Sequence, residues 1–221
     1  MTDPAVLVVR GEAVREVPPE LARFTVTVSV RDRDRAEALA RLAGRSDAVR
    51  RLVDGYAAAI ERRETGNLWV RPERKRSGDR VTGYVASVAT TVTVTDFGVL
   101  GELMLRLADE DETGIAGPWW ALRPESPAYR EARRAAVAEA IGRAREYAAA
   151  LGAELTALRE LSDAGQGDGH PMVLAAGVRY RNGGGVPDLD LDPEQQTVRA
   201  EVVARFSISP PRLEVVPDAA G

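Results

Sequence analysis

The sequence predicts an α+β fold, a mainly antiparallel sheet with three main helices packed on it, and three observations predict this class. First, residues 80–108 change from a strand period to a helix period at one residue, Asp96. Second, the strand-like segments alternate apolar and polar residues instead of forming continuous apolar runs, which favours antiparallel pairing with one covered face. Third, three longer segments carry apolar residues at helical spacing, as helices packed on a sheet do.

Strands are expected wherever apolar residues recur at every second position. In the second strand, for example, Phe24, Val26 and Val28 alternate with threonine and serine, which is typical of a strand with one buried face. Ser77-Gly78-Asp79 separates two strand-like segments and predicts a hairpin turn between them. The expected strands are residues 5–10, 22–31, 68–74, 80–95, 115–122, 153–161 and 198–208.

The first two helices are placed by capping residues. Asp34, followed by Glu37, predicts the start of a long helix that runs to about Arg63 and ends at Gly66. The side chain of Asp96 can accept hydrogen bonds from the free amides of the second helix.

The third helix has the clearest boundaries. Ser126-Pro127 gives the favoured order of cap and proline at its start, and Gly152 follows Leu151 as a stop. Its inner face is made mostly of small residues, which permit close approach to a sheet: Ala132, Ala136, Val137, Ala140, Ile141, Ala144, Ala148 and Leu151.

The length of 221 residues and a hydrophobic fraction of 44% predict a single domain over residues 1–209. Residues 164–194 are expected to be a glycine-rich loop region within that domain. Residues 210–221 follow the last strand and are expected to be a frayed tail.

Composition excludes several classes of function. The net charge of −4 does not provide the positive field that nucleic-acid binding needs, so we expect no nucleic-acid partner. The chain has no cysteine and one histidine, so disulfides and cysteine metal sites are excluded, and no cofactor is expected.

The apolar run at residues 5–9 is shorter than the ~7–15 residues of a secretory segment, and nothing elsewhere approaches the ~20 residues of a membrane span. We therefore expect a soluble, cytoplasmic protein without a membrane span.

Five ordered blocks make the chain resemble the SIMPL-domain family of bacterial proteins, which includes periplasmic immunogenic and oxidative-stress defence proteins. The blocks are VVRGEA, PPELARFTVTVSV, VRPERKRSGDRVTGYVASVATTVTVTDFGVLGELM, YREARRAAVAEAIGRAREYAAALGAELTALRELSD and EQQTVRAEVVARFSI. None is a catalytic signature, and their order and spacing carry the resemblance. The resemblance implies an α+β fold, assembly into large oligomers, a cellular role that is poorly defined, and a possible link to the envelope or to stress. This sequence departs from the family by showing no signal peptide.

Residues that could carry chemistry are mostly explained by structural roles. His170 lies in a loop near Asp163 and Asp168, without the nucleophile that a catalytic triad needs. The glycines at 183–185 read as a flexible linker, because no helix follows them to bind a phosphate.

Two charged segments also have structural interpretations. The acidic series Asp188, Asp190, Asp192 and Glu194 resembles the start of a calcium loop, but Pro193 and Arg199 stand where that loop requires glycine and an acidic ligand. A solvated loop is the better interpretation. A basic hairpin could hold an anion, although charges also protect exposed strand edges, which we favour here; its residues are Arg71, Arg74, Lys75, Arg76 and Arg80.

Two dipeptides have structural consequences. Gly83-Tyr84 is interpreted as a close-packing pair, because glycine in a strand often marks close approach of backbones. Trp119 and Trp120 are adjacent in a strand and therefore point to opposite faces. Trp120 is expected in the core, and Trp119 is expected to face a second layer or an interface with another subunit. The alternatives are a loop that covers Trp119, or a dipeptide that is not in regular strand.

These observations predict a non-catalytic protein whose activity is self-assembly as a homo-oligomer, with no catalytic, cofactor or metal-binding residues. The first alternative is a small-molecule binding module with a cleft near residues 164–194. The last alternative is a hydrolase or metal enzyme.

Overall fold

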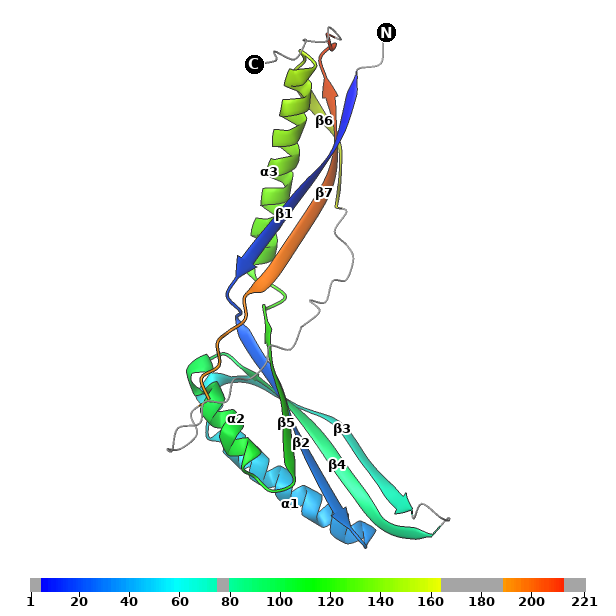
Figure 1. Cartoon of the computed structure of the whole chain (residues 1–221), viewed down its shortest axis with the longest axis vertical. Helices are drawn as coiled ribbons and strands as arrows, with labels where there is room; N and C mark the ends of the chain where they lie inside the picture. The colour runs from blue at the N-terminus through cyan, green and yellow to red at the C-terminus, as the bar shows by residue number, and fades with distance from the viewer. Residues whose placement is uncertain (1–4, 75–79, 164–188, 213–221) are drawn as a thin grey trace, which may run out of the picture. The chain divides into compact units, whose positions relative to one another are not determined.

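A computed structural model describes residues 5–74, 80–163 and 189–212, in which the chain forms seven strands, three α-helices and two short 3-10 helices (Figure 1). The α+β class with antiparallel sheets is confirmed. The strands divide between two sheets rather than one, because β1 pairs with β7 and β2 pairs with β4 and β5. The elements are β1 (Val6–Val17), β2 (Leu21–Asp32), α1 (Arg35–Asp54), η1 (Ala57–Ala59), β3 (Ile60–Arg74), β4 (Val81–Val94), η2 (Phe97–Val99), α2 (Leu100–Ala108), β5 (Thr113–Ala121), α3 (Pro127–Ala150), β6 (Leu155–Asp163) and β7 (Gln196–Ile208).

The contacts divide the chain into two compact units, each with its own sheet. Unit 1 comprises Met1–Val17, Pro124–Met172 and Gln195–Gly221, and unit 2 comprises Pro18–Arg123 and Val173–Glu194. The single domain over residues 1–209 stays a prediction, because two compact units can still unfold as one. The segment 164–188 and the tail 213–221 lie outside the described residues.

Unit 2 is a four-stranded antiparallel sheet in the order β3-β4-β2-β5, with α1 and α2 packed on one face (Figure 1). The alternation seen in the sequence puts Phe24, Val26 and Val30 on that face, where at most 1% of each is exposed. Leu100, Leu103 and Leu107 of α2 are fully buried in the same core. Among the described residues of unit 2, no helix covers the other face of this sheet, and we call it the open face.

Unit 1 is a three-stranded antiparallel sheet in the order β1-β7-β6, with α3 packed mainly on β1 and β7. The capping prediction for α3 is confirmed, since the Ser126 side chain accepts from the Ala128 amide and Gly152 has a positive φ of 61°. The alanine face is also confirmed; its buried members are Ala128, Ala132, Ala136, Ala140, Ala144 and Ala148.

The alanine face of α3 meets β1 at Gly11. A Cβ atom at Gly11 would lie 2.1 Å from the Ala136 carbonyl oxygen and 2.6 Å from the Ala140 amide nitrogen. Helix and strand therefore touch through their backbones, which only small residues allow. The VVRGEA block and the alanine series of the sequence are the two sides of one contact.

Ala140→Leu is expected to lower the melting temperature. Ala140 is 1% exposed, and its Cβ atom lies so near Gly11 that a Cβ added at Gly11 would be 2.7 Å from it. A leucine at position 140 therefore has no free volume to enter. Overpacking of a tight site typically costs ~1–3 kcal/mol. Thermal melting followed by circular dichroism measures the loss, and an unchanged curve would mean that the α3–β1 contact is loose.

The predicted end of the first helix is wrong. The helix was expected to reach Arg63, but α1 ends at Asp54, where the Gly55 amide bonds the Arg51 and Leu52 carbonyls. The next residues form η1 and then β3, whose ladder with β4 begins at Ile60 opposite Val94. Pairing with a long neighbouring strand outweighed the apolar spacing that continued the helix to Ile60.

The start of the second helix also differs slightly from the prediction. Asp96 does act as a cap, because its side chain accepts from the Gly98 amide at 3.0 Å. The residues that it caps form the 3-10 helix η2, and α2 starts at Leu100.

Candidate functional site

The two tryptophans of β5 point to opposite faces of the unit 2 sheet. Trp120 is 7% exposed and meets the Phe97 ring edge to face, with ring centroids 4.9 Å apart. Trp119 lies on the open face, opposite Arg23 of β2, and is 37% exposed. The expected core position of Trp120 is confirmed, and an interface at Trp119 stays a prediction.

The floor of the open face consists of short hydroxyl side chains from the two central strands. Thr25 and Thr91 lie opposite each other in β2 and β4, and their Oγ1 atoms are 3.4 Å apart. Ser87 and Thr93 on β4 are 3% and 5% exposed although no helix covers them. Larger side chains on the neighbouring strands therefore shield this floor of small groups.

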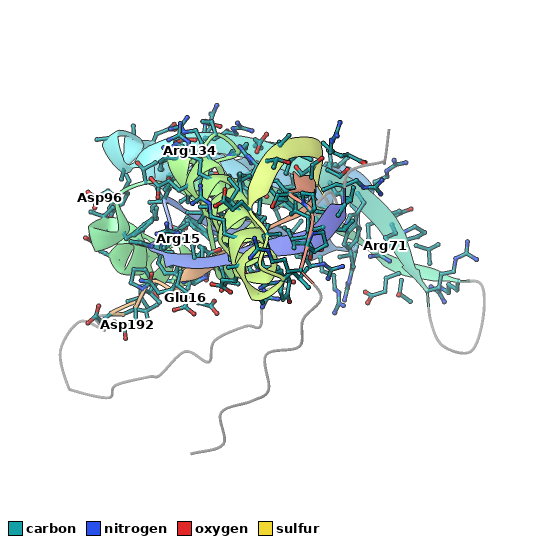
Figure 2. All side chains as sticks on the ribbon, turned by 90° about the horizontal axis from the view of Figure 1, so that it is seen from above. Arg15, Glu16, Arg71, Asp96, Arg134 and Asp192 are labelled. Carbon is teal, nitrogen blue, oxygen red and sulfur yellow. The ribbon has the colours of Figure 1, made fainter. Side chains whose placement is uncertain are left out.

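A second aromatic group lies on the same face, and the sequence analysis missed it. Trp69 of β3 is opposite Ser87, and the Arg71 guanidinium lies 3.9 Å from the Trp69 ring centroid. Arg71, labelled in Figure 2, projects from this edge strand. The spacing of two residues in a strand, which puts both side chains on one face, is the signal that could have revealed the pair.

One end of the open face adjoins a shallow hollow lined by Arg31, Asp32, Arg33, Glu73, Thr82 and Gly83. Its charges are largely matched within the chain, since Arg31 pairs with Glu73 at 2.9 Å and Arg41 pairs with Asp32 at 3.2 Å. The hydrogen bond from the Asp34 amide, followed by that from Arg41, lowers the pKa of Asp32. Because its charges are matched internally, this hollow is not a strong candidate for binding an anion.

Gly83 and Tyr84 have different roles in this region. A Cβ at Gly83 would lie 2.8 Å from the Asp32 carbonyl oxygen, so the backbones of β2 and β4 approach closely there. Tyr84 is half-buried and packs against the core of unit 2.

A polar cluster outside the open face joins the end of α1 to α2. The Tyr56 hydroxyl donates to Glu102 at 2.6 Å and accepts from Arg106 at 2.8 Å. Burial, followed by the hydrogen bond to Glu102, raises the pKa of Tyr56. Because the raised pKa keeps the Tyr56 hydroxyl protonated, this hydroxyl can donate to Glu102 while it accepts from Arg106. These two hydrogen bonds link the residues that follow α1 to α2.

Most of the other residues singled out in the sequence lie outside the described residues: Asp168, His170, the glycines 183–185, Asp188, Lys75 and Arg76. Asp190 and Asp192 are exposed (Figure 2 labels Asp192), while Leu191 between them packs on the unit 2 core. Within residues 5–74, 80–163 and 189–212, no group of three or more histidine, aspartate or glutamate side chains is arranged to hold a metal ion. No helix in the described part of the chain has the length and apolar character to cross a membrane.

An α+β architecture with this order of elements, two antiparallel sheets and a long alanine-faced helix defines the class of protein. Residues 7–206 match the family model described as SIMPL: Protein of unknown function (DUF541). The chain belongs to this family.

Two curated relatives, both named 26 kDa periplasmic immunogenic protein, come from Brucella melitensis and Brucella abortus. Each is 29% identical to the chain over 190 residues, which cover 80% of the chain and 73% of the relative. These relatives are periplasmic, so the expectation of a cytoplasmic location is contradicted. The short apolar run at residues 5–9 was a poor guide to the compartment.

Solved structures give only a distant likeness. A putative amidohydrolase/peptidase from Burkholderia cenocepacia superimposes with a TM-score of 0.30 and 19% identity, over 56% of this chain and 35% of that one. A hydantoinase/carbamoylase family amidase from Burkholderia ambifaria gives a TM-score of 0.26 and 16% identity, over 48% of this chain and 30% of that one. Superposition at this level carries no inference about activity.

Proposed function

We propose that this SIMPL protein is a non-catalytic, self-assembling protein of the periplasm, with an envelope- or stress-related role, and that its copies associate through the open face of unit 2. The observation that carries the proposal is the exposed Trp119 beside the buried Trp120. The names of the Brucella relatives support the compartment. The resemblance that implies oligomers supports self-association.

Burial of Trp119 supplies a driving force for association. An aromatic side chain buries ~150–250 Å² when it is fully covered, and Trp119 is 37% exposed, so association could bury about a third of that area, which at about 25 cal/mol per Å² corresponds to about 1–2 kcal/mol before ordering costs. In a symmetric assembly each such contact recurs. The larger side chains that shield the floor of threonine and serine, Trp119 among them, are the groups that a second surface would contact first.

Trp119→Ser is expected to shift the assembly toward monomer while the circular-dichroism spectrum stays unchanged. The reason is that Trp119 is 37% exposed and contributes little to the subunit core. Size exclusion with light scattering at tens of micromolar measures the molar mass.

Leu39→Ser is the matched control. Leu39 lies on α1, on the helix-covered side of the sheet, and is 39% exposed. The Leu39→Ser variant therefore removes an apolar side chain of similar exposure from the other side of the unit. Its molar mass should equal that of the wild type. An assembly that is indifferent to Trp119→Ser, or equally weakened by Leu39→Ser, would remove the open face from the proposal.

A further inference from the structure

The far end of the β3–β4 hairpin carries apolar side chains that the helices of unit 2 do not cover. Leu68 of β3 is opposite Val88 of β4, so both side chains lie on the helix side of the sheet. Val88 is 8% exposed and belongs to the unit 2 core, whereas Leu68 is 61% exposed. The reason is that α1 packs mainly on β2 and β4, and α2 packs mainly on β5. Val81, at the start of β4, adds a second apolar group that is 40% exposed.

The other face of the same strand carries the stacked pair of Trp69 and Arg71. The Arg71 guanidinium lies 3.9 Å from the Trp69 ring centroid. Stacking of this kind fixes the plane of the guanidinium and leaves its N–H groups, which lie in that plane, able to donate to an outside anion. An aromatic ring and a positive charge are therefore presented together beside the bare Leu68.

The arginines at this end of the hairpin lack the acidic partners that arginines have elsewhere in unit 2. On α1, Arg41 and Arg45 both pair with carboxylates. Within the described residues neither Arg71 nor Arg80 forms an ion pair, and Glu73 is taken by an arginine of β2 at 2.9 Å. This end of the sheet therefore carries uncompensated positive charge, although the net charge of the whole chain is −4.

Protection of a strand edge explains these arginines but not the apolar groups beside them. Charged side chains keep an outer strand from pairing with other chains, whereas an exposed leucine and tryptophan work against that protection. A surface that rests on phospholipid headgroups needs both kinds of side chain. Tryptophan favours the boundary between apolar and aqueous layers, and arginine lays its stem on apolar groups while its charge meets anionic lipid.

From these observations we propose that the end of the β3–β4 hairpin binds the surface of an anionic phospholipid bilayer. The arginines bind the lipid phosphates, and the apolar side chains enter the layer of headgroups. The residues that form this surface are Leu68, Trp69, Arg71, Arg80 and Val81.

The position of β3 in the sheet allows such a contact. In the strand order β3-β4-β2-β5, β3 is an outer strand. A flat surface that meets the sheet edge-on therefore touches side chains of both faces, Leu68 on one and Trp69 with Arg71 on the other. The contact stays at the level of the headgroups, because the backbone groups of an outer edge would lose their water in the hydrocarbon core.

This inference goes beyond the proposed self-association and does not depend on it. Trp119 lies on β5, which is the opposite outer strand of the sheet. An interface centred on Trp119 and a bilayer at the hairpin end therefore use opposite edges of unit 2. The periplasm proposed above is bounded by membranes, so a bilayer is at hand in that compartment.

Co-sedimentation with lipid vesicles tests the proposal. The wild-type protein should bind vesicles of phosphatidylcholine and phosphatidylglycerol in equal parts, and should stay in the supernatant with phosphatidylcholine alone. Each arginine near an anionic surface strengthens binding about fivefold, so Arg71→Gln/Arg80→Gln should weaken it roughly 25-fold. Leu68→Ser should also weaken binding to the anionic vesicles. Added salt should weaken binding of the wild type, because it screens the attraction.

Matched controls on unit 1 separate a local surface from a general loss of charge or apolar area. Leu158→Ser changes a leucine that is 55% exposed on β6. Arg133→Gln/Arg134→Gln removes the same charge from two exposed arginines of α3, of which Figure 2 labels Arg134. Both controls should bind the anionic vesicles as the wild type does.

The outcomes distinguish this proposal from its rivals and from the proposed function. Binding that needs the two arginines but is indifferent to Leu68→Ser would replace the bilayer by a soluble polyanion, which requires charge alone. No binding to anionic vesicles, or an equal loss in the controls, would overturn the inference and leave self-association intact. Trp119→Ser should keep the preference for anionic vesicles. A monomeric wild type that binds these vesicles would instead overturn the proposed function and leave this inference standing.

Discussion

Gly11→Ala is expected to be the most damaging single-methyl change in the described part of unit 1. The new Cβ would lie 2.1 Å from the Ala136 carbonyl oxygen and 2.6 Å from the Ala140 amide nitrogen, separations that atoms do not adopt. Both neighbours are backbone, so no side chain can rotate away, and α3 must move off β1. The loss should reach or exceed about 3 kcal/mol, the upper end for overpacked sites.

Thermal unfolding gives the size of this effect. A loss of about 3 kcal/mol in a chain of this length lowers the melting temperature by roughly 6–12 °C. Gly142→Ala is the matched control, because it lies on α3 with nothing within 4 Å of its added Cβ. That variant should be neutral or gain up to about 1 kcal/mol from helix propensity. Equal melting temperatures for Gly11→Ala and the wild type would refute the backbone contact.

Trp120→Ser should chiefly destabilise the subunit, in contrast to Trp119→Ser. Trp120 is 7% exposed and packs on Phe97 at the start of η2, so its removal leaves a large cavity in the unit 2 core. Loss of a buried tryptophan typically costs about 3–5 kcal/mol. Urea unfolding followed by circular dichroism measures the loss, and it should be far smaller for Trp119→Ser.

This comparison also separates the two faces of β5. If both substitutions lowered the unfolding free energy equally and left the molar mass unchanged, both tryptophans would belong to the core. The open face would then have no special role in association.

The fold could be predicted from the sequence where local signals and packing agree. The boundaries of α3 were clear because Ser126, Pro127 and Gly152 have capping roles that do not depend on distant residues. The opposite orientations of Trp119 and Trp120 follow from the geometry of any strand.

Predictions were wrong where a distant partner determines local structure. The end of α1 was placed too late because residues 60–65 carry no strong strand signal, and their pairing with β4 is visible only in three dimensions. The division into two sheets depends on β1 pairing with β7, its partner at the other end of the chain.

The candidate site could be predicted only in part. Trp119 was found from the sequence and Arg71 was noted only as part of a basic hairpin, but Trp69 was not singled out, because nothing local shows that its ring lies beside Arg71 on the open face.

The molar mass of the wild-type protein in solution tests the central claim, self-assembly, most directly. Light scattering after size exclusion at tens of micromolar should give a multiple of the 23.8 kDa chain mass, and Trp119→Ser should move it toward that single value. A wild-type mass equal to one chain at this concentration would contradict self-assembly as the activity of this protein.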